Sequence, residues 1–377
     1  MDFKLTEEQQ MLQETAERLV RDVYDFDSRN KFSESEAGFS TAFWQQMGEL
    51  GLTAIPFAEE LGGFGGSGIE TMLIMEQLGR GICLEPYMES VILAGGLIAQ
   101  LGSDAQKEAL MGDIASGQLQ AAVALDELNS HYDLANVTTT AKQQGSDWTL
   151  TGRKGVVIGG QTAGKILVSA RTGGDTRDEQ GISLFLIDPT AAGVSRRVYA
   201  TVDGRKACEL FLDNAKGELL GEAGKAFDAI RYQSGRAIAA LCAEAVGAMR
   251  SSCDLTLEYL KTRKQFGVPI GKFQVLQHRM VDMISELERA TSMATLAACL
   301  ADDEDSAERS AKLAAAKFVV NRAATSVAEQ SIQLHGGIAM TWEYSGAHYA
   351  KRLVMISHQF GDDDYHLEAY SAQLTGA

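Results

Sequence analysis

The chain has 377 residues, enough for two or three domains with substantial cores. Hydrophobic residues make up 45% and charged residues 23%, as in ordinary globular proteins, and no apolar run reaches the roughly 18 residues that a membrane span needs. The net charge of −17 excludes a broad basic surface, and with it nucleic acid as a main partner, but permits an anionic cofactor in a small basic pocket.

The first 120 residues predict a series of helices. Residues 6–23 are amphipathic, with Thr6 as the expected N-cap and two glutamates in the first turn. Further helices are expected at residues 43–50, 69–79, 92–101 and from 104 to about 117. The glycine-rich stretch between residues 57 and 66 is expected to be a plain loop, because a lone glycine-rich loop is weak evidence for phosphate binding.

The next hundred residues show a different pattern, in which short β-rich segments alternate with turn signals. The expected strands are residues 121–125, 137–142, 148–152, 156–158, 166–170, 182–188 and 209–212. Short strands at regular spacing without intervening helices predict an antiparallel barrel or sandwich. After Gly224 the chain returns to helical patterns for about 150 residues, and this order excludes a Rossmann fold.

A basic turn follows the helical pattern of residues 238–253. It reads Thr-Arg-Lys-Gln-Phe-Gly-Val-Pro-Ile at residues 262–270, with a glycine and a proline that end the helix. A cation at a helix C-terminus is common, since it meets the negative end of the helix dipole. The alternative is an anion site. Arg263, Gln265 and Phe266 would place a guanidinium, an amide and an aromatic ring side by side, which suits a pyrophosphate beside a flat ring.

A second candidate motif, Gln-Leu-His-Gly-Gly at residues 333–337, follows the helical pattern of residues 307–332. Two adjacent glycines at this place are typical of a helix C-cap and turn. They also allow backbone N–H groups to come close to a ligand. Both interpretations stay open for this motif taken alone.

The two motifs, about 70 residues apart and in this order, resemble those of the acyl-CoA dehydrogenase flavoproteins, where they hold FAD from two different subunits. The resemblance covers nearly the whole chain. It implies an α+β fold with an N-terminal helical domain (1–120), a middle antiparallel β-barrel (121–225) and a C-terminal four-helix bundle that carries FAD and the oligomer interface (226–377). It also implies an acyl-CoA substrate, a carboxylate that removes the C2 proton, a hydride transfer from C3 to the flavin, and an electron-transfer flavoprotein as acceptor.

The resemblance assigns cofactor-binding residues one by one. The positions that match the family's FAD cradle are Arg263, Gln265, Phe266, Gln333, Gly336 and Gly337. Three apolar residues fall where similar proteins surround the adenine, although each is also typical of a core position: Ile270, Phe273 and Leu276.

The catalytic glutamate of the family has no counterpart at the expected positions of this chain. Many relatives carry a Glu about 25 residues after the histidine of the glycine loop, where this chain has Phe360. Others carry it early in the helix before the basic turn, where residues 234–238 contain no acid. Asp362 is therefore the candidate base, with a capping or solvated acidic turn as the alternative. We interpret Glu244, further along that helix, as structural.

The middle segment also differs from the family at the residues that contact the flavin ring. Relatives carry a Thr-Glu-Pro-x-Ala-Gly-Ser-Asp run that hydrogen-bonds the flavin ring, and this chain reads Ala-Leu-Asp-Glu-Leu-Asn-Ser-His-Tyr-Asp at residues 124–133. A second flavin contact, Trp-Ile-Thr or Trp-Ile-Ser, reads Val-Val-Ile at residues 156–158. With the Leu-Glu-Pro-Tyr run at 84–87, these departures resemble the smaller subunits of pimeloyl-CoA dehydrogenase and of bacterial steroid side-chain acyl-CoA dehydrogenases, which pair two unlike, homologous chains.

Three hypotheses follow. The first is the smaller subunit of an FAD-dependent acyl-CoA dehydrogenase, an α2β2 heterotetramer with a larger homologous chain. The second is a structural partner that completes the FAD site of that chain without an active site of its own, and the third is an acyl-CoA-binding protein for another oxidation. Five scattered cysteines predict reduced thiols and a cytoplasmic location. The acidic run at residues 302–305 is expected to be a solvated turn, so we expect no metal site.

Overall fold

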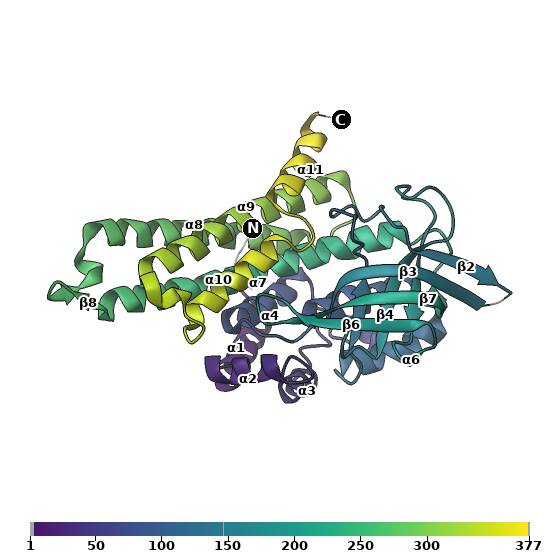
Figure 1. Cartoon of the computed structure of the whole chain (residues 1–377), viewed down its shortest axis with the longest axis horizontal. Helices are drawn as coiled ribbons and strands as arrows, with labels where there is room; N and C mark the ends of the chain where they lie inside the picture. The colour runs from purple at the N-terminus through teal and green to yellow at the C-terminus, as the bar shows by residue number, and fades with distance from the viewer. Residues whose placement is uncertain (1–3, 146, 376–377) are drawn as a thin grey trace. The chain divides into compact units, whose positions relative to one another are not determined.

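The computed structural model describes residues 4–145 and 147–375 (Figure 1). The chain divides into two compact units. The helical unit contains the residues up to Asn30, Ser67–Cys83 and the residues from Ile238 onward. The barrel unit contains Lys31–Gly66 and Leu84–Ala237. The division into three domains at residues 120 and 225 stays a prediction.

Long helices build the helical unit. Its elements are α1 (Glu7–Val23), α4 (Gly68–Gly81), most of α7 (Phe227–Thr262), α8 (Gln274–Leu300), α9 (Ala307–His335), α10 (Ser345–Ser357) and α11 (Asp363–Thr375). Helices α8, α10 and α11 all pack on α9 (Figure 1). Alanines dominate one buried cluster between α7, α8 and α9, including Ala239, Ala297 and Ala316. Alanine combines the highest helix propensity with a small side chain, so it favours both the helices and their close packing.

Helix α1 begins where the sequence predicts. The Thr6 hydroxyl accepts a hydrogen bond from the Gln9 backbone N–H (3.2 Å), and the Gln9 side chain accepts one from the Thr6 N–H (3.0 Å). This reciprocal pair is a capping box, which satisfies two backbone donors that the helix itself cannot satisfy.

A closed sheet forms the centre of the barrel unit. Its strands are β1 (Ala121–Ala124), β2 (Thr140–Gln144), β3 (Asp147–Ile158), β4 (Lys165–Arg171), β5 (Ile182–Ile187), β6 (Val194–Ala200) and β7 (Lys206–Leu220). The antiparallel pairs β2–β3, β3–β7, β7–β5 and β5–β4 lead around the sheet, and a parallel contact between Thr140 and Arg171 joins β2 to β4. The predicted barrel is thus confirmed, with the correction that β4 pairs in parallel with both β2 and β1.

Further helices of the barrel unit precede the strands in sequence. They are α3 (Thr41–Glu49), η1 (Glu59–Leu61), η2 (Met88–Gly95), α5 (Gly96–Leu101) and α6 (Asp104–Ala115). Helix η2 is wound as a π-helix, and all eight of its residues are buried. The sequence predicted a helix here but not its π winding, which is rare.

Three local predictions are corrected by the structure. Helix α2 (Phe26–Glu34) was not expected, because its sequence shows little periodicity and buries only Arg29. Strand β6 was missed because none of its residues is buried and it pairs only with β7. The separate strands at residues 148–152 and 156–158 are one strand, β3, which a bulge interrupts before Val157.

Among the described residues, no helix combines the length and the apolar composition that crossing a membrane requires.

Candidate functional site

The basic turn after α7 folds as a small hairpin. Strands β8 (Lys264–Gln265) and β9 (Val268–Pro269) pair antiparallel, and the two residues between them have positive φ, 53° for Phe266 and 78° for Gly267. Two left-handed residues are the pattern of a type I′ hairpin turn, but a bulky residue in the first position is strained. The ring of Phe266 is nevertheless 91% exposed. Strain combined with exposure of a large aromatic ring indicates a binding role.

The structure gathers the candidate residues of this motif on one short segment, formed by the hairpin, η3 (Ile270–Lys272) and the start of α8. Arg263 and Gln265 are exposed, and Ile270 and Leu276 are half-buried. The Ile270 N–H donates to the Arg263 carbonyl (2.8 Å), which closes the hairpin. The Phe266 ring meets the ring of Phe273 edge-on, with centroids 6.1 Å apart.

The second motif ends helix α9. His335 is the last helical residue, and Gly336 has a φ of 66°. Gln333, Gly336 and Gly337 are exposed, and a Cβ atom at either glycine would meet nothing within 4 Å. The packing of this chain therefore does not require glycine at Gly337, so the open backbone there suits the close approach of a ligand.

An aromatic contact brings the two motifs together. Tyr259 lies one turn before Arg263 on α7, and its ring centroid is 4.6 Å from that of His335. His335 Nδ1 donates to the Ser331 carbonyl (2.8 Å), and Nε2 accepts from the Tyr344 hydroxyl (2.5 Å). Burial lowers the pKa of His335, against the opposing effect of its backbone hydrogen bonds. A neutral His335 with a fixed tautomer thus holds the glycine loop beside the end of α7.

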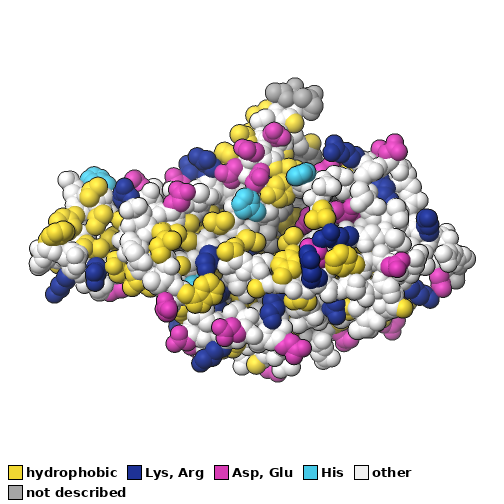
Figure 2. Space-filling model, viewed as in Figure 1, with side chains coloured by type: hydrophobic (Ala, Val, Ile, Leu, Met, Phe, Trp, Pro, Cys, Tyr) yellow, Lys and Arg dark blue, Asp and Glu magenta, His cyan; other side chains and the backbone are white. Residues whose placement is uncertain are grey.

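An apolar surface surrounds both motifs. Large exposed side chains follow the start of α8 and the loop after Gly337, and we call this set the apolar end: Phe266, Val275, Val281, Ile338, Met340 and Trp342. Figure 2 shows hydrophobic side chains gathered at the left of the view, where Figure 1 places the β8 hairpin. Trp342 is 58% exposed, and the Lys351 ammonium lies 4.0 Å from the centre of its ring. Contiguous exposed apolar surface is typical of a protein–protein contact.

Asp362 lies in a different place, in the turn between α10 and α11. Its carboxylate accepts a hydrogen bond from the Tyr365 N–H (3.0 Å), so it caps α11, and the residue is half-buried. In Figure 1 this turn lies well apart from the β8 hairpin within the helical unit. The structure therefore does not bring Asp362 together with the hairpin of the same chain.

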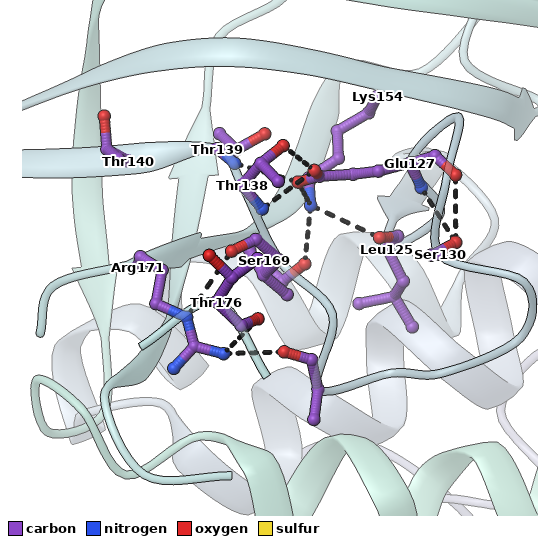
Figure 3. Close-up of polar contacts among 12 residues, drawn as sticks. Leu125, Glu127, Ser130, Thr138, Thr139, Thr140, Lys154, Ser169, Arg171 and Thr176 are labelled. Carbon is purple, nitrogen blue, oxygen red and sulfur yellow. Dashed lines mark hydrogen bonds and ion pairs between the residues drawn. The ribbon is translucent and has the colours of Figure 1, made fainter. Parts of the chain in front are cut away.

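In the barrel unit, a buried ion pair anchors the start of the run at residues 124–133 (Figure 3). The fully buried Lys154 donates from Nζ to Glu127 Oε1 (2.7 Å), the Ser169 hydroxyl (3.0 Å) and the Leu125 carbonyl (3.2 Å). Glu127 also accepts hydrogen bonds from both backbone and hydroxyl of Thr138 and from the Thr139 N–H. Burial alone would raise the pKa of Glu127, but Lys154 and these donors lower it to about 2.

Sequence reasoning missed this pair. A lysine between two expected β-rich segments carries no signal by itself. Only the Glu shared with relatives could have marked Glu127. The neighbours of the pair point away from the core: Asp126 is exposed, and Val156 is 50% exposed with a φ of 50°.

Family models match the chain along most of its length. The models for the N-terminal, middle and C-terminal domains of acyl-CoA dehydrogenase match residues 6–118, 122–215 and 227–375. The probable acyl-CoA dehydrogenase YngJ of Bacillus subtilis is 31% identical, over 91% of this chain and 92% of that protein.

Solved structures agree with this match. A chain of the Tcur3481–Tcur3483 steroid ACAD variant is 28% identical with a TM-score of 0.89, over 98% of both chains. A chain of the ChsE4–ChsE5 complex from Mycobacterium tuberculosis is 25% identical with a TM-score of 0.88, over the full length of both chains. The chain therefore belongs to the acyl-CoA dehydrogenase family, whose members are FAD-dependent oxidoreductases.

Proposed function

We propose that this chain is the smaller subunit of a heteromeric acyl-CoA dehydrogenase, which desaturates an acyl-CoA thioester between C2 and C3 and works with a larger homologous chain as an α2β2 tetramer. The proposal rests on a difference between the motifs of the helical unit and the flavin-contacting segments of the barrel. The β8–β9 hairpin and the Gly336–Gly337 loop keep the side chains of the FAD cradle and expose them. The barrel segments that meet the flavin ring in relatives carry different side chains.

The barrel difference has a chemical consequence. The Lys154–Glu127 pair still anchors the loop, but Asp126 carries a carboxylate where relatives have the hydroxyl of a threonine. An ionised carboxylate cannot donate a hydrogen bond to a flavin carbonyl, and it repels the negative charge of a reduced ring. Val156 likewise supplies an aliphatic side chain where relatives carry tryptophan. This barrel is therefore a poor flavin contact, and the partner would supply a better one.

The helical unit fits FAD. We propose that both motifs serve one FAD, because the Tyr259–His335 contact holds them side by side. Arg263 would pair with the pyrophosphate, the Phe266 ring would pack against a flat ring of the cofactor, and the glycine loop would bring backbone N–H groups to its oxygens. When bound, FAD supplies the acceptor for the hydride.

Asp362 is our proposal for the group that takes the C2 proton. Its separation from the hairpin supports an active site shared between chains. The alternative, a structural partner without an active site of its own, is favoured by the hydrogen bond that already engages the Asp362 carboxylate as the cap of α11. An acyl-CoA substrate and an electron-transfer flavoprotein as acceptor belong to the proposal. The five free cysteines support its cytoplasmic location.

Purification of this chain alone, and together with its larger homologue, tests the proposal. We expect the pair to form an α2β2 tetramer with two FAD molecules that oxidises acyl-CoA, because the apolar end then meets a partner. The chain alone is expected to retain little FAD and to be inactive. Mass by light scattering, the ratio of flavin to protein absorbance and acyl-CoA oxidation are the measurements. A fully flavinylated and active homotetramer would contradict the proposal.

The Arg263→Ala variant should lose FAD. A hydrogen bond to a charged group contributes about 1.5–3 kcal/mol, so we expect the assembled enzyme to bind FAD roughly 10- to 100-fold more weakly. Flavin absorbance after gel filtration is the measurement, and Lys261→Ala, which removes an exposed cation two residues earlier, is the matched control. Full retention of FAD in Arg263→Ala would remove Arg263 from the site.

A further inference from the structure

Lys317 occupies an unusual position inside the helical unit. It lies in the middle of α9, and its side chain is fully buried. Its Nζ donates to Asn321 Oδ1 (2.8 Å), one turn further along, and to the Ile356 carbonyl (2.7 Å). The amide of Asn321 in turn donates to the Ser357 carbonyl (3.3 Å). Lys317 and Asn321 together therefore contact the last two carbonyls of α10, and that of Ile356 also accepts a hydrogen bond from the Gln359 N–H (3.1 Å).

A second buried group, the Arg352 guanidinium, holds the side chain of Gln359, two residues after Ser357. Arg352 on α10 forms two hydrogen bonds to the carboxylate of Glu244 on α7, Nε to Oε1 (2.6 Å) and Nη2 to Oε2 (2.7 Å). Its Nη1 donates to the side chain of Gln359 (3.1 Å). Two-point pairing fixes the direction of the guanidinium as well as its distance, so Gln359 is held in a defined place.

The chain then turns sharply. Phe360 has a φ of 56° and Gly361 a φ of 114°, after which Asp362 caps α11. A Cβ on Gly361 would lie 2.6 Å from His366 Nε2, so the ring of the buried His366 packs directly on the turn. A phenylalanine in the left-handed region is strained, and such strain persists only where the surroundings determine the conformation.

The charge of Lys317 is not explained by a simple packing role. Among the described residues, its two hydrogen-bond acceptors are uncharged oxygens. Burial lowers the pKa of Lys317 to about 8, a shift that Cys242, Asp363 and Asp362 oppose and Arg352 supports. The ammonium thus costs the folded state free energy at neutral pH. An apolar side chain of similar length would fill the same space without that cost.

We propose that Lys317 is a positioning residue, which fixes the carbonyl end of α10 and thereby the α10–α11 turn that presents Asp362. Its role in the reaction rests on the function proposed above, whereas its effect on the turn does not. The Lys317→Met variant keeps the volume and removes both the donors and the charge. A residue that merely filled the core would, when replaced, loosen the turn and the whole helical unit together.

Hydrogen exchange by mass spectrometry tests the first part. In Lys317→Met we expect the amides of residues 358–366 to exchange about 10-fold faster or more, while the melting temperature at pH 7 changes little. The matched control is Lys312→Met, an exposed lysine on the same helix that pairs with Glu308. If Lys317→Met does not fold, Asn321→Ala removes the donor to Ser357 and should loosen the same segment. Unchanged exchange at residues 358–366 in the folded variant would overturn the proposal.

Turnover separates this inference from the proposed function. In the assembled α2β2 enzyme, Lys317→Met should lower kcat about 10-fold and leave KM unchanged, because the substrate still binds beside a misplaced turn. Faster exchange in the turn with unchanged kcat would support the positioning of the turn and contradict the catalytic role of Asp362.

Discussion

The Asp362→Asn variant of the assembled enzyme is expected to slow the reduction of its flavin by acyl-CoA about 100-fold or more. An amide cannot accept the C2 proton, and removing a general base typically costs a factor of 10² to 10⁴. The fold should persist, because asparagine caps a helix N-terminus about as well as aspartate and can still accept the hydrogen bond from Tyr365. Stopped-flow absorbance of the flavin measures the rate.

Asp364→Asn is the matched control, since it removes a carboxylate from the same helix turn without touching the cap. An unchanged rate in Asp362→Asn would leave this residue as the cap of α11. The subunit would then be the structural partner, and the base would belong to the larger chain.

Glu127→Gln is expected to destabilise the protein by about 3–5 kcal/mol, which is the typical cost of breaking a buried ion pair from one side. The reason is that Lys154 would keep its charge in a fully buried position, with only the Ser169 hydroxyl and the Leu125 carbonyl as polar contacts of full strength. Urea denaturation followed by circular dichroism measures the loss. Asp147→Asn removes an exposed pair with Lys216 and should cost less than about 1 kcal/mol.

The same pair predicts acid sensitivity. The pKa of Glu127 is lowered to about 2 in the folded protein, so its stabilisation is complete above the pKa of an ordinary glutamate, near 4.5, and is lost as the pH falls toward 2. A shift of this size corresponds to about 3 kcal/mol. The wild-type protein should lose this amount relative to Glu127→Gln over that pH range, and equal losses in both proteins would contradict the pairing.

The sequence predicted the architecture where a pattern has a direct physical cause. Helical patterns marked α7 and α9, the Thr6 cap marked the start of α1, and turn signals separated most strands of the barrel. It failed where the cause is not local. The π winding of η2, whose residues are all buried, has no local signal in the sequence, and β6 forms along the edge of β7 although none of its own residues is buried.

The candidate site, too, was predicted from the sequence only in part. The basic turn and the glycine loop were found from their residues and the family resemblance, and the contact between Tyr259 and His335 that joins them is tertiary. The burial of Lys317 and Lys154 could not be predicted from a sequence pattern, because the sequence alone does not distinguish a buried lysine from a solvated one. Only the three-dimensional structure shows that the side chains of Lys154 and Lys317 lie away from water.

The three tryptophans differ in exposure, so tryptophan fluorescence can report the assembly of this subunit with a partner. Trp44 is buried and donates to the Gly117 carbonyl, and Trp148 is half-buried against Phe185. Trp342 is the exposed one, in the loop after the two glycines and beneath the Lys351 ammonium. Iodide, an anionic quencher, should therefore reach Trp342 selectively in the free subunit. As the loop becomes covered by a partner, its emission should shift to shorter wavelength and become protected from iodide, without any added label.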